Sequence, residues 1–310
     1  MPFGKKNAHP HPNKEDEDGY TPLINAVHPC SENDVGWLLE SDANPNLESG
    51  GLTPVYLAAQ EGHTKCLQLL LKHGAEPNQI ITPDASAPVY IAASQGHAKC
   101  LKILLGNNVD PNIKTGDNET PAYIAAQNGH EECLQLLLKH NANPNLASTD
   151  DGITPAYMAA QNGHFKCLKL LLENKANPDQ ARTDTGSTPV FVAAQNDHFK
   201  CLKLLLEHDA KPNQVRTDGV TPMLVAKNYG NTECLKLLQD HLKLKFEEFI
   251  TMREEKLFKR EIQGGTRKTH AKKKKSKKKQ NIKYKNKSVK RKNMRKKHKS
   301  IKRNNTRKNK

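Results

Sequence analysis

A dipeptide that recurs at nearly constant spacing constrains the fold of this chain most. Thr-Pro stands at six positions, Ala-Pro fills the one gap in the series, and consecutive steps are 32, 34, 33, 34, 34 and 33 residues. Periods of about 20–50 residues are typical of repeat proteins, in which every unit stacks on its neighbours. The series therefore predicts seven stacked units, and the dipeptides begin at Thr21, Thr53, Ala87, Thr120, Thr154, Thr188 and Thr221.

Each unit reads as two short helices followed by a loop. Thr caps a helix and Pro suits its first position, so Thr53-Pro54 predicts the start of a short, Ala-rich helix. Gly62-His63 interrupts that helix, and a second helix follows in which Leu67, Leu70 and Leu71 share one face. Ala-x-Pro-Asn then begins a polar loop. A single unit cannot bury its apolar face, but a stack of units can.

These residues resemble the ankyrin repeat, whose signature is T-P-L-H-x-A-A followed by G-H and L-L. The resemblance covers roughly residues 17–245 and implies an all-α solenoid of helix-turn-helix units with hairpin loops. It also implies a function in protein–protein recognition. The seven units are about 17–49, 50–82, 83–115, 116–149, 150–183, 184–216 and 217–245.

The chain departs from the ankyrin pattern where Tyr or Phe replaces the usual His of T-P-L-H. We favour a packing ladder between units for these aromatic side chains. A stripe for partner contact is the alternative, because aromatic residues dominate binding hot spots. The series is Tyr56, Tyr90, Tyr123, Tyr157 and Phe191.

The segments that flank the repeats differ from them in kind. Residues 1–16 are polar, and we expect them to be disordered. The second helix of the last unit is predicted to continue as an extension over 246–263. The side chains expected to close the final apolar face are Leu242, Phe246, Phe249 and Ile250.

The segment 264–310 carries a charge opposite to that of the rest of the chain. It contains 24 Lys or Arg and no acidic residue, which leaves 25 basic and 33 acidic residues, a net charge of −8, in 1–263. Nothing apolar is periodic in this tail, so it is predicted to be disordered. The clusters expected to bind a polyanion are Lys272, Lys273, Lys274, Lys275, Lys277, Lys278, Lys279, Lys290, Arg291, Lys292, Arg295, Lys296 and Lys297.

Nucleic acid is the target that this basic tail favours. Each basic side chain that engages a phosphate releases a counterion, which gives binding independent of base sequence. Such clusters are also typical of nuclear or nucleolar import signals. An anionic membrane ranks lower because the chain shows no lipid anchor. A tail that only solubilises the protein, associates with itself or lies on the acidic body stays an alternative.

The junction of the tail carries a second resemblance. Gly264-Gly265-Thr266-Arg267-Lys268 and the basic run after it resemble tails on proteins of large DNA viruses of protists. This resemblance implies a host-interaction factor.

Five units carry His-x-x-Cys, a spacing that could suggest zinc. We favour the interpretation that the His bonds to backbone in the turn and the Cys packs as a small hydrophobe. A tetrahedral site would need ligands from two units, and stacked helices lie about 8–10 Å apart. Neither a metal nor another cofactor is therefore expected. The same spacing also argues against disulfides, whose Cα atoms must lie closer together. The pairs are His63/Cys66, His97/Cys100, His130/Cys133, His164/Cys167 and His198/Cys201.

The start of the chain and its cysteines predict a location. No apolar segment suits a signal peptide or a membrane span, and the seven cysteines then favour an intracellular, reducing compartment. The basic clusters favour the nucleus or nucleolus of a eukaryotic or virus-infected cell, and the cytoplasm otherwise. No phosphate loop, nucleophile elbow or carboxylate pair stands out, so we do not expect an enzyme.

The sequence therefore predicts a monomeric adaptor that grips an unknown protein partner while its tail tethers it to nucleic acid. A nucleic-acid-binding protein that acts mainly through the tail and a host-targeted effector are the alternatives. The resemblance places partner contacts on the concave face, at first-helix ends and loop tips. These candidates are Gln60, Glu61, Ser94, Gln95, Lys114, Gln127, Asn128, Asp150, Asp151, Gln161, Asn162, Arg182, Asp184, Gln195, Asn196, Arg216 and Asp218.

Overall fold

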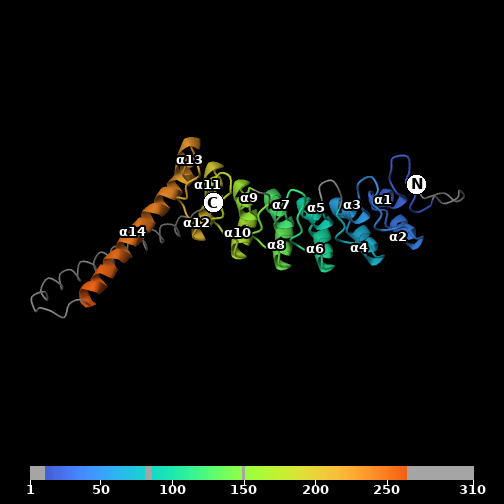
Figure 1. Ribbon diagram of the computed structural model, residues 1–310, viewed down its shortest axis with the longest axis horizontal. Coiled ribbons are helices and arrows are strands. Elements are labelled where there is room, and N and C mark those ends of the chain that lie inside the picture. Colours follow the sequence, from blue (N-terminus) through green and yellow to red (C-terminus); the bar gives the residue numbers. More distant parts are fainter. Residues whose placement is uncertain (1–10, 81–85, 149–150, 264–310) are drawn as a thin grey trace, which may run out of the picture. The chain divides into compact units, whose positions relative to one another are not determined.

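The computed structural model describes residues 11–80, 86–148 and 151–263 of the chain. These residues form fourteen α-helices and no β-strand, and consecutive helices pair into seven units that follow one another in a row (Figure 1). This confirms the predicted all-α solenoid. The first helices of the units are α1 (Pro22–Val27), α3 (Pro54–Gln60), α5 (Pro88–Ser94), α7 (Pro121–Asn128), α9 (Pro155–Gln161), α11 (Pro189–Gln195) and α13 (Pro222–Tyr229). The second helices are α2 (Glu32–Glu40), α4 (Thr64–Lys72), α6 (Ala98–Gly106), α8 (Glu131–Lys139), α10 (Phe165–Glu173), α12 (Phe199–Glu207) and α14 (Thr232–Gln263).

The Thr-Pro dipeptides start the first helices in the predicted manner. The Thr53 hydroxyl accepts a hydrogen bond from the Tyr56 backbone N–H at 3.2 Å, and Pro54 is the first helical residue. The same cap recurs at the other threonines of the series. Ala87 has no side-chain oxygen, so α5 begins without this bond. The periodic dipeptide therefore sets where each unit begins.

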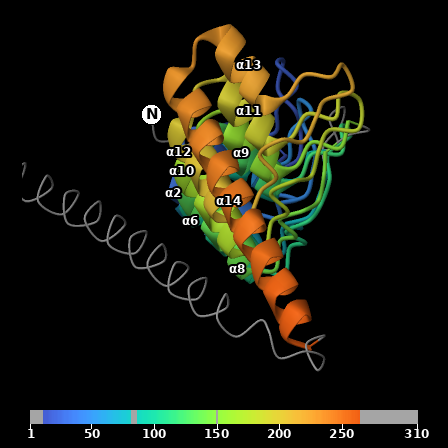
Figure 2. The ribbon, with the colours of Figure 1, turned by 90° about the vertical axis from the view of Figure 1, so that its left-hand side faces the viewer.

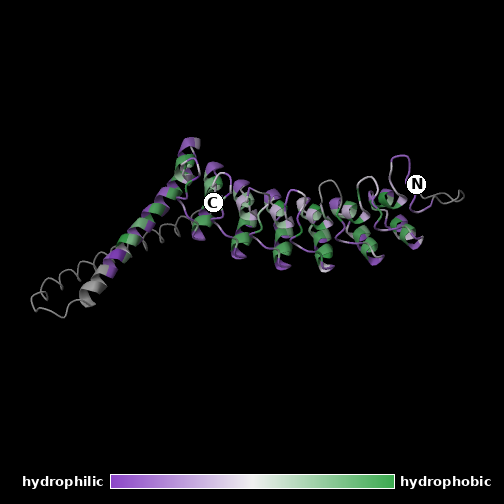
Figure 3. Cartoon of the chain, in the orientation of Figure 1, coloured by the Kyte–Doolittle hydropathy of each residue, from purple (hydrophilic) through white to green (hydrophobic). Residues whose placement is uncertain are grey.

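The core runs along the whole row of units. Ala58 and Ala59 of α3 are fully buried, and such small side chains let the next first helix approach closely. Leu67 and Leu70 of α4 are also fully buried, and their counterparts recur in α6, α8, α10 and α12. In Figure 3 the apolar residues lie on the helices, whereas the connecting loops are largely hydrophilic. Each unit thus completes the apolar surface of its neighbour.

The loops gather on one side of the stack (Figure 2). Asparagine side chains connect them from unit to unit. The Oδ1 of Asn46 accepts from the Glu76 N–H at 2.7 Å, and the Oδ1 of Asn145 accepts from the Asn177 N–H at 2.7 Å. The Oδ1 of Asn13 accepts from the Asn44 N–H at 2.6 Å in the same way. The prediction of disorder for residues 1–16 is therefore wrong at Asn13, which bonds to the first unit as the later asparagines bond to theirs.

The last helix continues past the final unit, as the sequence predicted. The chain up to Leu244 is one compact unit, and α14 extends beyond it to Gln263. The expectation that its aromatic side chains close the final apolar face is wrong, because Phe246 is 66% and Phe249 55% exposed. Ile250 is exposed as well. An uninterrupted helix offers no turn that could fold these side chains back over α13.

A membrane-spanning helix is not found among the described residues, none of whose helices is both long and apolar enough.

Candidate functional site

Histidines that immediately precede the second helices tie each unit to the one before it. The Nε2 of His97 lies 3.0 Å from the Gln60 carbonyl oxygen, and the Nε2 of His164 lies 3.0 Å from that of Gln127. The same contact recurs at the other histidines of the series, His63, His130 and His198. This confirms the interpretation that these side chains bond to backbone in the turn.

The asparagines predicted to contact a partner bond to the backbone of the preceding unit. The Nδ2 of Asn162 donates to the Gln127 carbonyl at 2.8 Å, and the Nδ2 of Asn196 donates to the Gln161 carbonyl at 2.8 Å. Asn128 makes the equivalent bond to Ser94 at 2.9 Å. These three side chains therefore satisfy helix-end carbonyls of the preceding unit, which have no partner within their own helix.

The glutamines beside them are free to contact a partner. Gln60, Gln127 and Gln161 are partly exposed, and their side-chain amides make no hydrogen bond to another described residue. The Nε2 of Gln195 donates to the Tyr229 hydroxyl at 3.4 Å. In the third unit Ser94 holds this place, while Glu61 and Gln95 are exposed next to it in their units. The second to sixth units thus each present one uncharged polar side chain at the same place.

Loop-tip charges pair with one another across neighbouring units. The guanidinium of Arg182 donates to both Asp184 carboxylate oxygens at 2.9 and 2.6 Å, and also to Asp151 at 3.2 Å. The Arg182 hydrogen bonds lower the pKa of Asp184 from 3.8 to about 2. Arg216 repeats this pattern one unit later, 3.3 Å from Asp218 and over the Phe191 ring at 5.0 Å.

Backbone bonds connect the same loops. The Thr183 N–H donates to the Asp151 carbonyl at 2.9 Å, and the Thr217 N–H donates to the Thr185 carbonyl at 3.0 Å. Lys114, on an earlier loop, is exposed. The last loops therefore form one preordered edge. Asp150 and the basic clusters of the tail, from Lys272 to Lys297, lie outside the described residues.

Comparison with known families agrees with this architecture. A family model described as "Ankyrin repeats (3 copies)" matches residues 5–81, 89–182 and 176–248, which together make up most of the chain. The chain is an ankyrin-repeat protein. Ankyrin repeats are protein–protein interaction modules and typically carry no enzymatic activity, so this stack is a protein-binding scaffold.

Individual relatives of this ankyrin-repeat protein are more distant. The human ASB11 ankyrin repeat domain, a crystal structure, superposes with a TM-score of 0.63 at 25% identity, over 71% of this chain and 98% of that domain. Zygote-specific protein 3 of Chlamydomonas reinhardtii is 36% identical over 75 residues, which is 24% of this chain. That alignment spans only 20% of the relative.

The aromatic series belongs to the interior of the ankyrin stack. Tyr123, Tyr157 and Phe191 are buried, and Tyr56 is nearly so. Tyr90 is the member that stays partly exposed, and its hydroxyl donates to the Glu119 carboxylate of the next unit. Burial and this carboxylate raise the pKa of Tyr90. The packing interpretation is therefore confirmed, and the Tyr90–Glu119 bond is an inter-unit contact that the repeat pattern alone did not indicate.

Most cysteines of the ankyrin stack form a buried column, one per unit. Cys100, Cys133, Cys167, Cys201 and Cys234 are free thiols on the second helices. Burial raises the pKa of Cys133 to about 12 and that of Cys201 to about 11. These thiols are therefore protonated at neutral pH, and they pack as the small hydrophobes that the sequence predicted.

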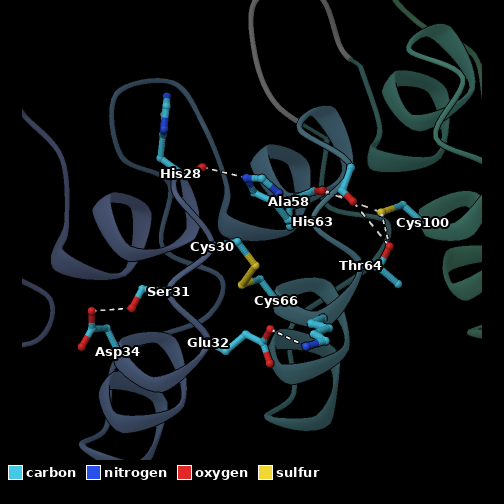
Figure 4. Close-up of a disulfide and its surroundings, with 12 residues drawn as sticks. His28, Cys30, Ser31, Glu32, Asp34, Ala58, His63, Thr64, Cys66 and Cys100 are labelled. Carbon is cyan, nitrogen blue, oxygen red and sulfur yellow. Dashed lines mark hydrogen bonds and ion pairs between the residues drawn. A yellow bond between two sulfur atoms is a disulfide. The ribbon is translucent and has the colours of Figure 1, made fainter.

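Two cysteines contradict the prediction that the units hold no disulfide. Cys30 and Cys66 are disulfide-bonded, with their Cα atoms 5.9 Å apart (Figure 4). The prediction used the spacing of stacked helices, but Cys30 lies in the turn before α2 with a φ of 51°. From that turn it reaches the second helix of the next unit. A Cys in place of the usual turn glycine is the signal that could have revealed it.

Proposed function

We propose that this protein is an adaptor whose ankyrin stack binds a protein partner while its basic tail tethers the complex to nucleic acid. The observation that carries the proposal is the row formed by Gln60, Gln127 and Gln161, whose amides make no hydrogen bond within the described chain. Each carboxamide offers two N–H donors and one carbonyl acceptor. Three such groups, in the second, fourth and fifth units of a scaffold with about 8–10 Å between neighbouring helices, suit a partner that runs along the stack.

The preordered loop edge supports the same assignment. Arg182, Asp151 and Asp184 are already fixed by their mutual bonds, so a partner that contacts them does not have to order them first. Ordering a flexible, charged side chain at an interface costs free energy, and a surface held in advance avoids that cost.

Replacing the glutamine row tests the partner-binding face. A Gln60→Ala, Gln127→Ala, Gln161→Ala triple variant should lose at least about tenfold in affinity for the main protein captured by the wild type. Its melting temperature should stay near that of the wild type, because these three amides make no hydrogen bond to another described residue. A matched control replaces Gln68 and Gln135, which are exposed on the second helices α4 and α8. If the triple variant and the control bind alike, the proposed face is wrong.

The tail is tested separately by deleting residues 264–310. The full chain should bind duplex DNA or RNA with an affinity that falls steeply as salt rises. For duplex DNA, each phosphate contact should lower the logarithm of the binding constant by roughly 0.9 for every tenfold rise in salt concentration. The deleted chain should lose this binding and any nuclear accumulation, yet still capture the protein partner. Loss of partner capture as well would favour a protein that acts mainly through its tail. Co-sedimentation with anionic vesicles in place of nucleic acid would favour a membrane target.

A further inference from the structure

The disulfide joins the first two units from a turn position that is glycine in five of the other six units. Cys30 occupies the turn position that is glycine in the next four units, at Gly62, Gly96, Gly129 and Gly163, all with positive φ. A residue with a Cβ pays a conformational penalty in this left-handed region. Cys66 is the first member of the cysteine column, and the rest of that column stays unbonded. The pairing is therefore a feature of the first unit alone.

We propose that Cys30 and Cys66 form a reversible thiol–disulfide site that exchanges with a dithiol reductant and controls how firmly the first helix pair docks on the second. The inference does not depend on the identity of any binding partner. It concerns the start of the described stack, where α1 packs against α3 and α2 against α4. Terminal units of a repeat protein are held by a single interface and open most readily.

The two sulfurs differ in access, which sets the direction of the exchange. Cys30 is partly exposed and Cys66 fully buried, so an incoming thiolate attacks the Cys30 sulfur. That attack forms a mixed disulfide with Cys30 and releases Cys66 as a thiolate, which takes a proton. The second thiol of the reductant then attacks the reductant's sulfur in the mixed disulfide, and Cys30 leaves as a thiolate that takes a proton. Two electrons and two protons pass to the protein, and the dithiol leaves as a cyclic disulfide.

The remaining thiols do not compete in this exchange. Cys100 is the neighbour of Cys66 in the column, and its sulfur lies 3.7 Å from the Thr64 hydroxyl and 3.9 Å from the Ala58 carbonyl oxygen (Figure 4). It is fully buried, and burial raises its pKa, so it is not a thiolate at neutral pH. After reduction Cys66 becomes one more buried thiol of this column. Cys30 is the cysteine positioned to re-form the bond.

Besides the disulfide, hydrogen bonds between loops and a surface ion pair link the first unit to the second. The Oδ1 of Asn46 accepts from the Glu76 N–H at 2.7 Å, and its Nδ2 donates to the Gly74 carbonyl at 3.2 Å. The Lys65–Glu32 ion pair at 2.8 Å lies on the surface, where such pairs contribute little. The Nε2 of His63 contacts the His28 carbonyl oxygen at 2.7 Å, as its counterparts do in later units. Breaking the covalent link therefore leaves the first pair with these non-covalent links and its packing, and its opening becomes easier.

Hydrogen exchange of the full chain before and after treatment with dithiothreitol tests the proposal. Mass mapping should find Cys30 joined to Cys66 in the untreated protein and both free after treatment under native conditions. Amides of α1 and α2 should then exchange about a hundredfold faster, because closing a loop of this length stabilises its ends substantially. Amides of α7–α10 should not change. A disulfide that resists native reduction, or equal exchange in both states, would overturn the proposal.

Two variants separate this site from a general effect of thiols. Cys30→Ser should show fast exchange in α1 and α2 with or without dithiothreitol. Cys201→Ala keeps the disulfide and removes a column thiol, so it should respond to the reductant as the wild type does. If Cys30→Ser kept the slow exchange of the oxidised wild type, the disulfide would have no control over docking.

Discussion

Two glycines at the same place in their repeats have different surroundings. Gly129 and Gly230 share a left-handed backbone, with φ of 77° and 74°. A Cβ on Gly129 would lie 2.6 Å from the His164 Nδ1, whereas one on Gly230 would meet nothing within 4 Å. The imidazole of the histidine that ties one repeat to the next therefore packs against the glycine of the repeat before it, where a Cβ would clash with the ring.

Alanine at these two positions should separate backbone strain from steric conflict. Gly230→Ala should lower the free energy of unfolding by about 1–2 kcal/mol, because a residue with a Cβ is strained in the left-handed region. Gly129→Ala should cost roughly 1–3 kcal/mol more, because the His164 ring must also move. Urea denaturation of both variants measures the difference. Equal losses would mean that the histidine ring adapts freely.

The ion pair at the loop tips gives a pH prediction at the same scale. The Arg182 guanidinium holds the pKa of Asp184 at about 2, below its ordinary 3.8. A carboxylate with a depressed pKa stabilises the folded state above its unfolded pKa, and this effect is lost as the pH falls through about 2. A carbon-detected NMR titration should place the Asp184 midpoint near 2, and Arg182→Ala should move it up toward 3.8. An unchanged midpoint would contradict the assigned cause.

Adjacent residues at the end of a first helix divide two tasks between them. The Asn162 side chain bonds to the preceding repeat, while the Gln161 side chain makes no bond within the described residues. The element therefore carries a residue that bonds to the stack next to the residue that we propose contacts a partner. The Asn of the Gln-Asn pair in three repeats is explained by stacking alone.

Single substitutions in α9 and the turn after it should separate the two roles. Asn162→Ala should destabilise the stack by about 0.5–1.5 kcal/mol, because the Gln127 carbonyl loses a donor. Gln161→Ala should stay within about 0.5 kcal/mol of the wild type, as most surface substitutions do. Chemical denaturation measures both. Equal destabilisation would show that Gln161 also holds the stack together.

At the scale of the whole molecule, the solenoid is complete before α14 ends. All residues from Lys243 to Lys256 are exposed, and the compact unit ends at Leu244. Every side chain of the extension is thus exposed up to Lys256. Its apolar side chains Phe246, Phe249 and Ile250 are exposed on the surface of α14.

Removing the extension should accordingly leave the stack intact. A chain of residues 1–244 should melt within about 2 °C of a chain of residues 1–263, because the side chains from Lys245 to Lys256 that it loses are exposed. Differential scanning calorimetry of the two chains provides the comparison. A fall of about 5 °C or more would mean that the extension supports the last repeat after all.

The repeat pattern predicted most of the fold because each feature has a local cause. Thr53 caps, Pro54 starts and Gly62 ends a helix through bonds and angles within a few residues. Leucines at helical spacing then mark the buried face. The candidate site was predicted less well: the pattern placed Gln161 and Asn162 together, but only the inter-unit bond distinguishes them.

By itself, the sequence determined that seven units stack, where each helix begins and that a basic tail follows an acidic body, since period, caps and charge are written in neighbouring residues. The tertiary structure alone decided that Cys30 meets Cys66, that Asn13 joins the stack and that Phe246 stays exposed. The physical reason is distance along the chain. These outcomes depend on where one unit lies against another, or on a neighbour that is missing, and no local rule specifies either.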